Sequence, residues 1–396
     1  MYIPTMYHNK IENNRKLHMM KLIAVSLLCT ASLPKHSAAV SSRTIASFIA
    51  SLSRHSFSLS STTSRNMSIQ TAEQKKSLIN CPTLSLRDGS SHPAIGFGTY
   101  KVGFTPASAS SAVAAGGATS EPKRTAEECV LDALQVGYRF LECAEFYGNE
   151  KEVGKAIKAS GLPREDLFLC SKVWTTTIEN GDDAIRAQLE KTLSDLGTDY
   201  LDLYLIHWPV PGKHVDAYKT LLDLKNEGKV RNVGVSNYAV EDMKELLSSG
   251  IAGEDKPVVN QIEINPFLYR KNTIEYFKSE GVVLQSYRSL RDGKAMDNPV
   301  LKEFGEKYEK SPAQILGRWC VQHGFVCMPK SVKIERMVEN SLVFDFELSE
   351  EDMATLDALT TSDSLEAFKA LYEKCVNRDT TKDGTMEGVK TDITID

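Results

Sequence analysis

The sequence predicts an α/β fold, a parallel (β/α)8 barrel preceded by a short β-hairpin. Short apolar runs recur along the chain, and each is followed by a segment with the period of an amphipathic helix. Eight such strand–helix units fall within about 250 residues, which is the repeat number and the usual length of a (β/α)8 barrel. Hydrophobic residues make up 41% of the chain and charged residues 25%, the composition of an ordinary globular protein.

The hairpin is expected where the folded region begins. Thr83–Arg87 and His92–Ile95 have the pattern of two short strands, and the turn residues Asp88 and Gly89 lie between them. This arrangement predicts a β-hairpin before the first barrel strand.

The eight strand–helix units follow in chain order. The third has the clearest helix, because Ile185, Leu189, Leu193 and Leu196 fall on one stripe and Gly197 supplies the C-terminal stop. The expected strands, each with the helix that follows it, are Pro93–Thr99 with Glu127–Val136, Arg139–Cys143 with Glu150–Ser160, Leu167–Val173 with Asp182–Leu196, Asp199–Ile206 with Asp216–Glu227, Val230–Val235 with Glu241–Ser249, Val258–Ile264 with Thr273–Glu280, Val282–Ser286 with a helical region between Val300 and His323, and Phe325–Met328 with Ile334–Asn340.

A doubly wound open sheet is the alternative fold for alternating strands and helices. That fold usually carries a GxGxxG turn that directly opens a helix. Here Gly96-Phe97-Gly98 is followed by TYKVG and a long Ala/Ser segment, so the pattern is not completed. The TIM barrel is therefore the better prediction.

Three regions depart from the barrel pattern. Residues 1–67 form an expected targeting leader, residues 105–120 an Ala/Ser-rich surface insertion, and residues 366–396 a C-terminal extension. The barrel itself is assigned to residues 68–365.

The leader carries eight Lys or Arg residues and the single acid Glu12, a net charge of 8 − 1 = +7. Its Ser-rich, acid-poor composition is typical of a transit peptide, whereas the short apolar run Leu22–Leu28 behind Lys21 resembles a secretory h-region. A bipartite address would combine both, and a start at Met67 would remove the leader altogether. We expect an organelle (mitochondrion or plastid) if the leader is translated, and the cytoplasm otherwise.

Composition also limits the partners. Lys plus Arg is 47 and Asp plus Glu is 52, a net charge of -5, which does not favour nucleic-acid binding. The leader's apolar run is too short for a membrane span. The eight cysteines occur singly, without a CxxC pair, which argues against a zinc ribbon or a disulfide framework and favours a reducing compartment. We therefore expect no nucleic-acid or membrane partner, and a monomer.

Polar side chains follow several expected strands at the end where a barrel carries its catalytic groups. Glu142 ends the second strand and Tyr147 follows it, Lys172 and Trp174 share one face of the third, and His207 ends the fourth. A lysine beside a phenol is expected to lower the pKa of the tyrosine, a carboxylate can hold the lysine, and a histidine can orient a carbonyl oxygen. These groups together suffice for proton transfer.

The segments GYRFLECAEFYGNE, FLCSKVW, YLDLYLIHWP, GKVRNVGVSNY and MPKSVKIERMVEN resemble, in order, those of the aldo-keto reductase superfamily, over roughly residues 84–359. The resemblance implies a (β/α)8 barrel that binds NADPH without a Rossmann domain and reduces aldehydes and ketones to alcohols. It implies that Tyr147 is the general acid, with Lys172 and Glu142 as its partners. His207 would orient the carbonyl of a small substrate, with Trp174 beside it.

The resemblance also implies a cofactor site at the later strands. Ser236, Asn237 and Gln261 would bind the nicotinamide carboxamide, and Tyr287 would stack on the ring. Toward the end of the barrel Lys330, Ser331 and Arg336 would bind the 2′-phosphate, with Glu339 and Asn340 at the adenine. Cations beside the start of the last helix suit a phosphate on physical grounds as well.

Two departures from the family pattern leave a second function open. Glu142 stands where the family has Asp, and Arg288-Ser289-Leu290-Arg291 stands where it commonly has Ser-Pro-Leu-Gly. The arginines could bind the pyrophosphate directly. The alternative is an NADPH-binding sensor or scaffold with weak or no turnover. The histidines and acids show no HxxH or HExxH spacing, so we expect no metal.

Overall fold

The computed structural model describes residues 79–103 and 124–379. All of them belong to the second of two compact units, Glu73–Asp396. The expected leader, residues 1–67, and the expected insertion, residues 105–120, lie outside the described residues.

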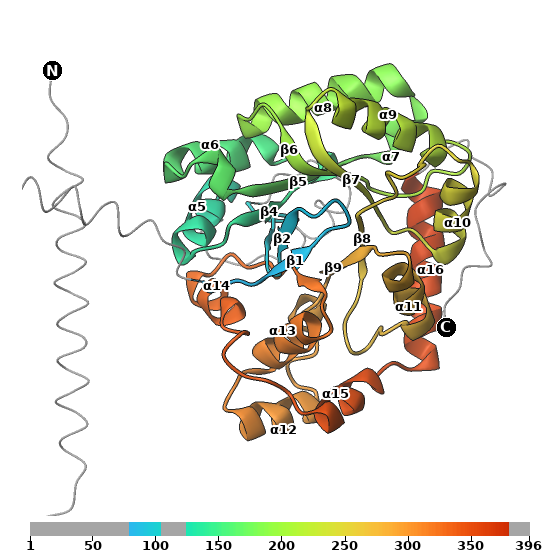
Figure 1. Cartoon of the computed structure of the whole chain (residues 1–396). Coiled ribbons are helices and arrows are strands. Elements are labelled where there is room, and N and C mark those ends of the chain that lie inside the picture. The colour runs from blue at the N-terminus through green and yellow to red at the C-terminus, as the bar shows by residue number, and fades with distance from the viewer. Residues whose placement is uncertain (1–78, 104–123, 380–396) are drawn as a thin grey trace, which may run out of the picture. The chain divides into compact units, whose positions relative to one another are not determined.

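Eight parallel strands form one sheet in the order β10-β9-β8-β7-β6-β5-β4-β3. Backbone hydrogen bonds then join its two edges: Gly96 N donates to Cys327 O and Cys327 N donates to Ala94 O, both at 2.9 Å. The closed sheet confirms the (β/α)8 prediction, and Figure 1 shows the helices around it. The strands are β3 (Phe97–Gly98), β4 (Phe140–Glu142), β5 (Phe168–Val173), β6 (Leu201–Ile206), β7 (Val230–Ser236), β8 (Val259–Glu263), β9 (Val283–Tyr287) and β10 (Val326–Cys327).

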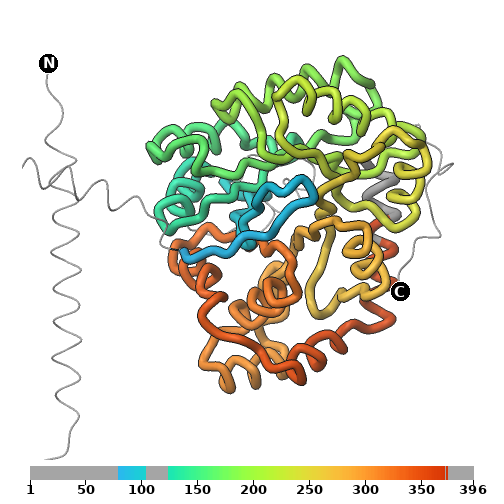
Figure 2. The backbone as a smooth tube through the Cα atoms, viewed as in Figure 1, coloured from blue at the N-terminus to red at the C-terminus, as the bar shows by residue number. Residues whose placement is uncertain are grey.

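The hairpin is present. Strands β1 (Thr83–Ser85) and β2 (Ser91–Pro93) pair antiparallel. The buried ring of His92 packs against Phe140 and Phe168, the first residues of β4 and β5, with centroids 4.8 and 4.3 Å apart. The hairpin therefore closes the N-terminal end of the barrel, and its blue trace crosses that end in Figure 2.

The helices surround the barrel. They are α5 (Ala126–Val136), α6 (Glu150–Ser160), α7 (Thr175–Glu179), α8 (Asp182–Leu196), α9 (His214–Asn226), α10 (Val240–Ser248), α11 (Lys271–Ser279), α12 (Pro299–Tyr308), α13 (Pro312–Gln322), α14 (Ile334–Ser341), α15 (Glu350–Asp357) and α16 (Ser362–Asp379), with short 3₁₀ turns η2 (Glu145–Tyr147), η3 (Arg164–Asp166) and η4 (Arg291–Gly293). The expected stripe of α8 is buried, and Gly197 ends that helix at φ 69°. Within the described ranges, no helix is long and apolar enough to cross a membrane.

Several elements differ from the expectation. The first barrel strand is only β3, because Pro93 pairs within the hairpin instead. The expected helical region after β9 is two helices, since α12 ends at Glu309 with φ 54° and α13 begins anew at the cap Ser311 followed by Pro312. The short helix α7 was not expected.

The boundary expected at residue 365 falls inside α16. This helix packs on the barrel: Tyr372 is buried and clusters with Phe368, Trp208 and Ala239. Its hydroxyl donates to Asp242 Oδ2 at 3.1 Å. The first part of the expected extension is therefore part of the barrel wall, while residues 380–396 lie outside the described residues.

Candidate active site

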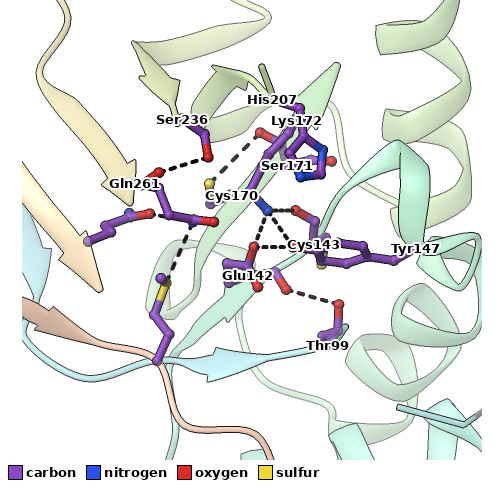
Figure 3. A network of polar contacts seen from close by, with 12 residues as sticks. Thr99, Glu142, Cys143, Tyr147, Cys170, Ser171, Lys172, His207, Ser236 and Gln261 are labelled. Carbon is purple, nitrogen blue, oxygen red and sulfur yellow. Dashed lines mark hydrogen bonds and ion pairs between the residues drawn. The ribbon is translucent and has the colours of Figure 1, made fainter. Parts of the chain in front are cut away.

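Four predicted catalytic side chains meet where β4, β5 and β6 end. Glu142 is the last residue of β4, Lys172 lies near the end of β5, and His207 directly follows β6. Tyr147 reaches them from η2, in the loop after β4. Figure 3 shows the four side chains directed toward one another.

Lys172 is fully buried, and its ammonium has three oxygen partners. It forms an ion pair with Glu142 Oε1 and donates to the Cys143 carbonyl and to the Tyr147 hydroxyl, each at 2.9 Å. A buried ammonium is stable only when its hydrogens are paired in this way. The extra methylene of Glu142 therefore does not break the contact with Lys172.

The tyrosine hydroxyl makes a contact that the sequence did not predict. It donates to Glu142 Oε1 at 2.9 Å while accepting from Lys172. Burial, followed by the charge of Glu142 and this hydrogen bond, raises the pKa of Tyr147 well above its ordinary value. The net direction is therefore opposite to the lowering expected from Lys172, mainly because the phenol is buried and also because the Glu142 carboxylate opposes the ammonium. Tyr147 keeps its proton at neutral pH.

His207 lies in an aromatic pocket. The Trp174 ring is edge-on to it at 4.8 Å, and the Phe146 ring stacks on Trp174 at 3.9 Å between centroids. Burial and the nearby Lys172 charge lower the pKa of His207 well below its ordinary value, so the imidazole is neutral. Its Nδ1 is buried without a hydrogen-bond partner in the described part of the chain.

Glu145 is a site residue that sequence reasoning missed. Its Oε2 accepts from the backbone N–H of Trp174 at 2.7 Å and its Oε1 from the Thr177 hydroxyl at 2.7 Å. It thereby ties η2, which carries Phe146 and Tyr147, to the loop that carries Trp174. Its position two residues before Tyr147 was the only available signal.

The predicted nicotinamide residues form a second group beside the first. Asn237, at φ 59°, donates to His207 O at 3.0 Å and to Ser236 Oγ at 3.1 Å, and its Oδ1 accepts from the Tyr287 hydroxyl at 2.8 Å. Ser236 Oγ also donates to Gln261 O at 2.9 Å. Gln261 is buried, and Figure 3 shows its amide turned toward the catalytic group.

The predicted phosphate residues lie at the last strand and α14. Lys330 and Arg336 are exposed, and neither makes an ion pair within the described ranges. Ser331 is buried, and its Oγ accepts from Lys333 N at 3.0 Å, which shapes the turn before α14. Two unpaired cations beside a helix N-terminus fit a phosphate. The predicted adenine residues Glu339 and Asn340 follow on the same helix.

The arginines that replace the family's usual segment have intramolecular partners. Arg288 pairs with Glu263 Oε2 at 3.1 Å and Asp292 Oδ2 at 3.0 Å. Arg291 lies over the Phe267 ring at 5.0 Å. A pyrophosphate at Arg288 would compete with these two carboxylates for the guanidinium.

No three His, Cys, Asp or Glu side chains gather as a metal site in the part of the chain that the structure describes. The predicted cofactor residues fit a reduced dinucleotide better than they fit a metal ion. The cations Lys330 and Arg336 can meet a 2′-phosphate, and Gln261 presents an amide near the catalytic group.

A model of the Aldo/keto reductase family matches residues 94–361. The chain belongs to this family. It is 42% identical to a glyoxal reductase of Bacillus subtilis over 277 residues, which are 70% of this chain and 92% of that protein.

Solved structures of the family agree with the fold. An aldose reductase from Schistosoma japonicum matches with a TM-score of 0.64 and 32% identity, over 77% of this chain and 100% of that one. A Bombyx mori aldo-keto reductase in complex with NADP matches with a TM-score of 0.62 and 28% identity, over 71% of this chain and 94% of that one. As an aldo/keto reductase, this chain is an NAD(P)-dependent oxidoreductase of carbonyl compounds.

Proposed function

We propose that the protein reduces aldehydes or ketones to alcohols with NADPH. The observation that carries this proposal is the buried contact of Tyr147 with Lys172, next to the neutral His207. A protonated phenol, a fixed cation and a neutral imidazole are what proton delivery to a developing alkoxide requires.

Each side chain has a separate role in this proposal. Tyr147 donates its proton to the carbonyl oxygen, and Lys172, 2.9 Å from that hydroxyl, stabilises the phenolate that forms. His207 donates a hydrogen bond to the same carbonyl oxygen and so orients the substrate. NADPH, when bound, supplies the hydride. Ser236, Asn237 and Gln261 bind and orient its carboxamide, with Tyr287 against the ring.

Preference for NADPH over NADH rests on Lys330 and Arg336. Both are exposed and without an ion-pair partner among the described residues, so binding a phosphate breaks no existing pair. Charge-assisted hydrogen bonds to phosphate are stronger than neutral ones. NADPH is therefore the preferred cofactor.

The pocket favours a small, planar carbonyl substrate. The stacked rings of Phe146 and Trp174 form one wall beside His207. The α16 residues Phe368 and Tyr372 pack against Trp208, which follows the same strand as His207. The similarity to a glyoxal reductase suggests small aldehydes such as glyoxal as first substrates.

A second function is favoured by one specific contact. The hydrogen bond from Tyr147 to Glu142 directs the proton away from the substrate. A protein with this resting geometry could bind NADPH and turn over slowly or not at all, as a sensor or scaffold.

The deciding experiment measures NADPH oxidation by the full chain with glyoxal, small aliphatic aldehydes and aryl aldehydes, and repeats it with NADH. We expect turnover with at least one aldehyde and a clear preference for NADPH. Tight NADPH binding without turnover on the whole panel would instead support the sensor. Absence of NADPH binding would contradict both.

A further inference from the structure

A chain of hydrogen bonds runs through the barrel from the hairpin to the predicted nicotinamide site. Gln261 Nε2 donates to Gln285 Oε1 at 2.8 Å, and Gln285 Nε2 lies 2.8 Å from His92 Nε2. His92 Nδ1 in turn lies 2.8 Å from the Pro93 carbonyl oxygen. All three side chains are at most 2% exposed. The hairpin thus contacts the cofactor site through two side chains.

The chemistry of each group sets the direction of every bond. The Pro93 carbonyl can only accept, so Nδ1 of His92 carries the hydrogen. Burial lowers the pKa of His92 to about 4, so the ring is neutral and its Nε2 can only accept. Gln285 therefore turns its NH₂ to His92 and its oxygen to Gln261.

Packing leaves the side chains of this hydrogen-bond chain little freedom to adopt the opposite orientation. The His92 ring is packed between Phe140 and Phe168, and Gln261 and Gln285 are direct partners on β8 and β9. Gln261 Nε2 also lies 3.7 Å from Met328 Sδ, a second acceptor for its hydrogens. Gln261 Oε1 is consequently the atom left to accept a hydrogen bond from a ligand.

The neighbouring polar oxygens already accept hydrogen bonds within the protein, which distinguishes them from Gln261 Oε1. Asn237 Oδ1 already accepts from Tyr287, and Ser236 Oγ both donates to the Gln261 carbonyl and accepts from Asn237. Gln261 Oε1 has no such partner within the described residues. Of these three oxygens, Gln261 Oε1 is therefore the one with its full acceptor capacity left for a ligand N–H.

We infer that His92 and Gln285 are positioning residues, which fix the Gln261 amide so that Oε1 accepts a hydrogen bond from the nicotinamide carboxamide. Neither residue touches the cofactor in this inference. It rests on the proposed NADPH-dependent function. It assigns to the hairpin a role in cofactor recognition besides closing the barrel.

The test compares two cofactors that differ in one group. Reduced 3-acetylpyridine adenine dinucleotide phosphate carries a methyl group where NADPH has the carboxamide NH₂, so it cannot donate to Gln261. Dissociation constants of both are measured by fluorescence titration of the full chain and of Gln285→Met, which keeps the side-chain length. We expect about tenfold weaker binding of NADPH and less than about twofold for the analogue, since one hydrogen bond is lost only with NADPH.

A second variant guards against a folding defect. His92→Phe fills the space between Phe140 and Phe168 but removes the hydrogen bond between His92 and Gln285. We expect NADPH to bind about threefold more weakly to this variant and the affinity for the analogue to stay unchanged. Gln188→Met is the matched control, because Gln188 loses only a bond to Thr192 on the outer helix α8. It should bind both cofactors as the unmutated protein does.

Failure of this inference can be distinguished from failure of the proposed function. Equal weakening of NADPH and the analogue in both variants, or no weakening of either, would overturn the positioning role while leaving the proposed function intact. An unmutated protein that binds no NADPH would overturn the proposed function and this inference together.

Discussion

Replacing Glu142 by Asp is expected to make the protein a faster reductase. The Tyr147 hydroxyl donates to Glu142 Oε1 at 2.9 Å, and this bond must break before the proton can point at a substrate. Removing one methylene retracts the carboxylate by about 1.5 Å, which places it beyond hydrogen-bond reach of the hydroxyl. Lys172 keeps its contacts with Tyr147 and the Cys143 carbonyl.

The expected gain follows from the strength of that bond. A hydrogen bond to an ionised carboxylate contributes about 1.5–3 kcal/mol, and about 1.4 kcal/mol corresponds to tenfold in rate. We therefore expect kcat for aldehyde reduction to rise about tenfold in Glu142→Asp. The nearby carboxylate also contributes to the raised pKa of Tyr147, so moving it away should lower that pKa. Because the rate falls when Tyr147 loses its proton, the decline of the rate at high pH should begin at a lower pH in Glu142→Asp.

The assay is NADPH oxidation with a saturating aldehyde from pH 6 to 11, for Glu142→Asp and two controls. Glu150→Asp shortens another buried carboxylate, which binds Ser171 and Thr192 and not Tyr147, and should leave the rate unchanged. Glu142→Gln keeps the length but leaves Lys172 without its counter-charge, which should cost about 3–5 kcal/mol of unfolding free energy. An unchanged or lower kcat in Glu142→Asp, with NADPH binding intact, would refute the reasoning.

Three further predictions concern other parts of the protein. Arg336→Ala should reduce the preference for NADPH over NADH about tenfold, measured as the ratio of dissociation constants; an unaltered ratio would exclude Arg336 from the phosphate site. Glu145→Ala should raise the KM for aldehyde about fivefold with little change in kcat, because it frees the backbone of Trp174; a fall confined to kcat would contradict this. Burial lowers the pKa of His92 from 6.5 to about 4, so the unfolded chain binds a proton that the folded chain excludes between these values. The unfolding free energy should therefore fall by about 2 kcal/mol more between pH 7 and 4.5 in the unmutated protein than in His92→Phe, and equal losses in urea titrations would be the contrary result.

Much of the fold could be predicted because its signals are local. The bounds of α6 and α8 match the predicted Glu150–Ser160 and Asp182–Leu196, since Gly161 and Gly197 end these helices in the left-handed conformation. The division of the region after β9 into α12 and α13 was missed, although Ser311 and Pro312 are a local signal for a new helix.

The arrangement of the site could be predicted only in part. Lys172 and His207 come together because the carboxyl ends of neighbouring parallel strands meet at one end of the barrel. The contact of Tyr147 with Glu142 depends on one methylene and a rotamer, so no spacing rule could reveal it. The bond between His92 and Gln285 joins residues 193 apart and depends on how the hairpin docks.

The most direct test of the proposed reductase is a single-turnover measurement on Tyr147→Phe. NADPH binding should be unchanged within about twofold, while the rate of NADPH oxidation by an aldehyde should fall about 100-fold or more, since only the proton donor is removed. Tyr100→Phe, which removes a hydroxyl from the neighbouring ring 5.1 Å away, is the control and should react at nearly the unmutated rate. A Tyr147→Phe protein that oxidises NADPH as fast as the unmutated one would contradict the central role of this tyrosine.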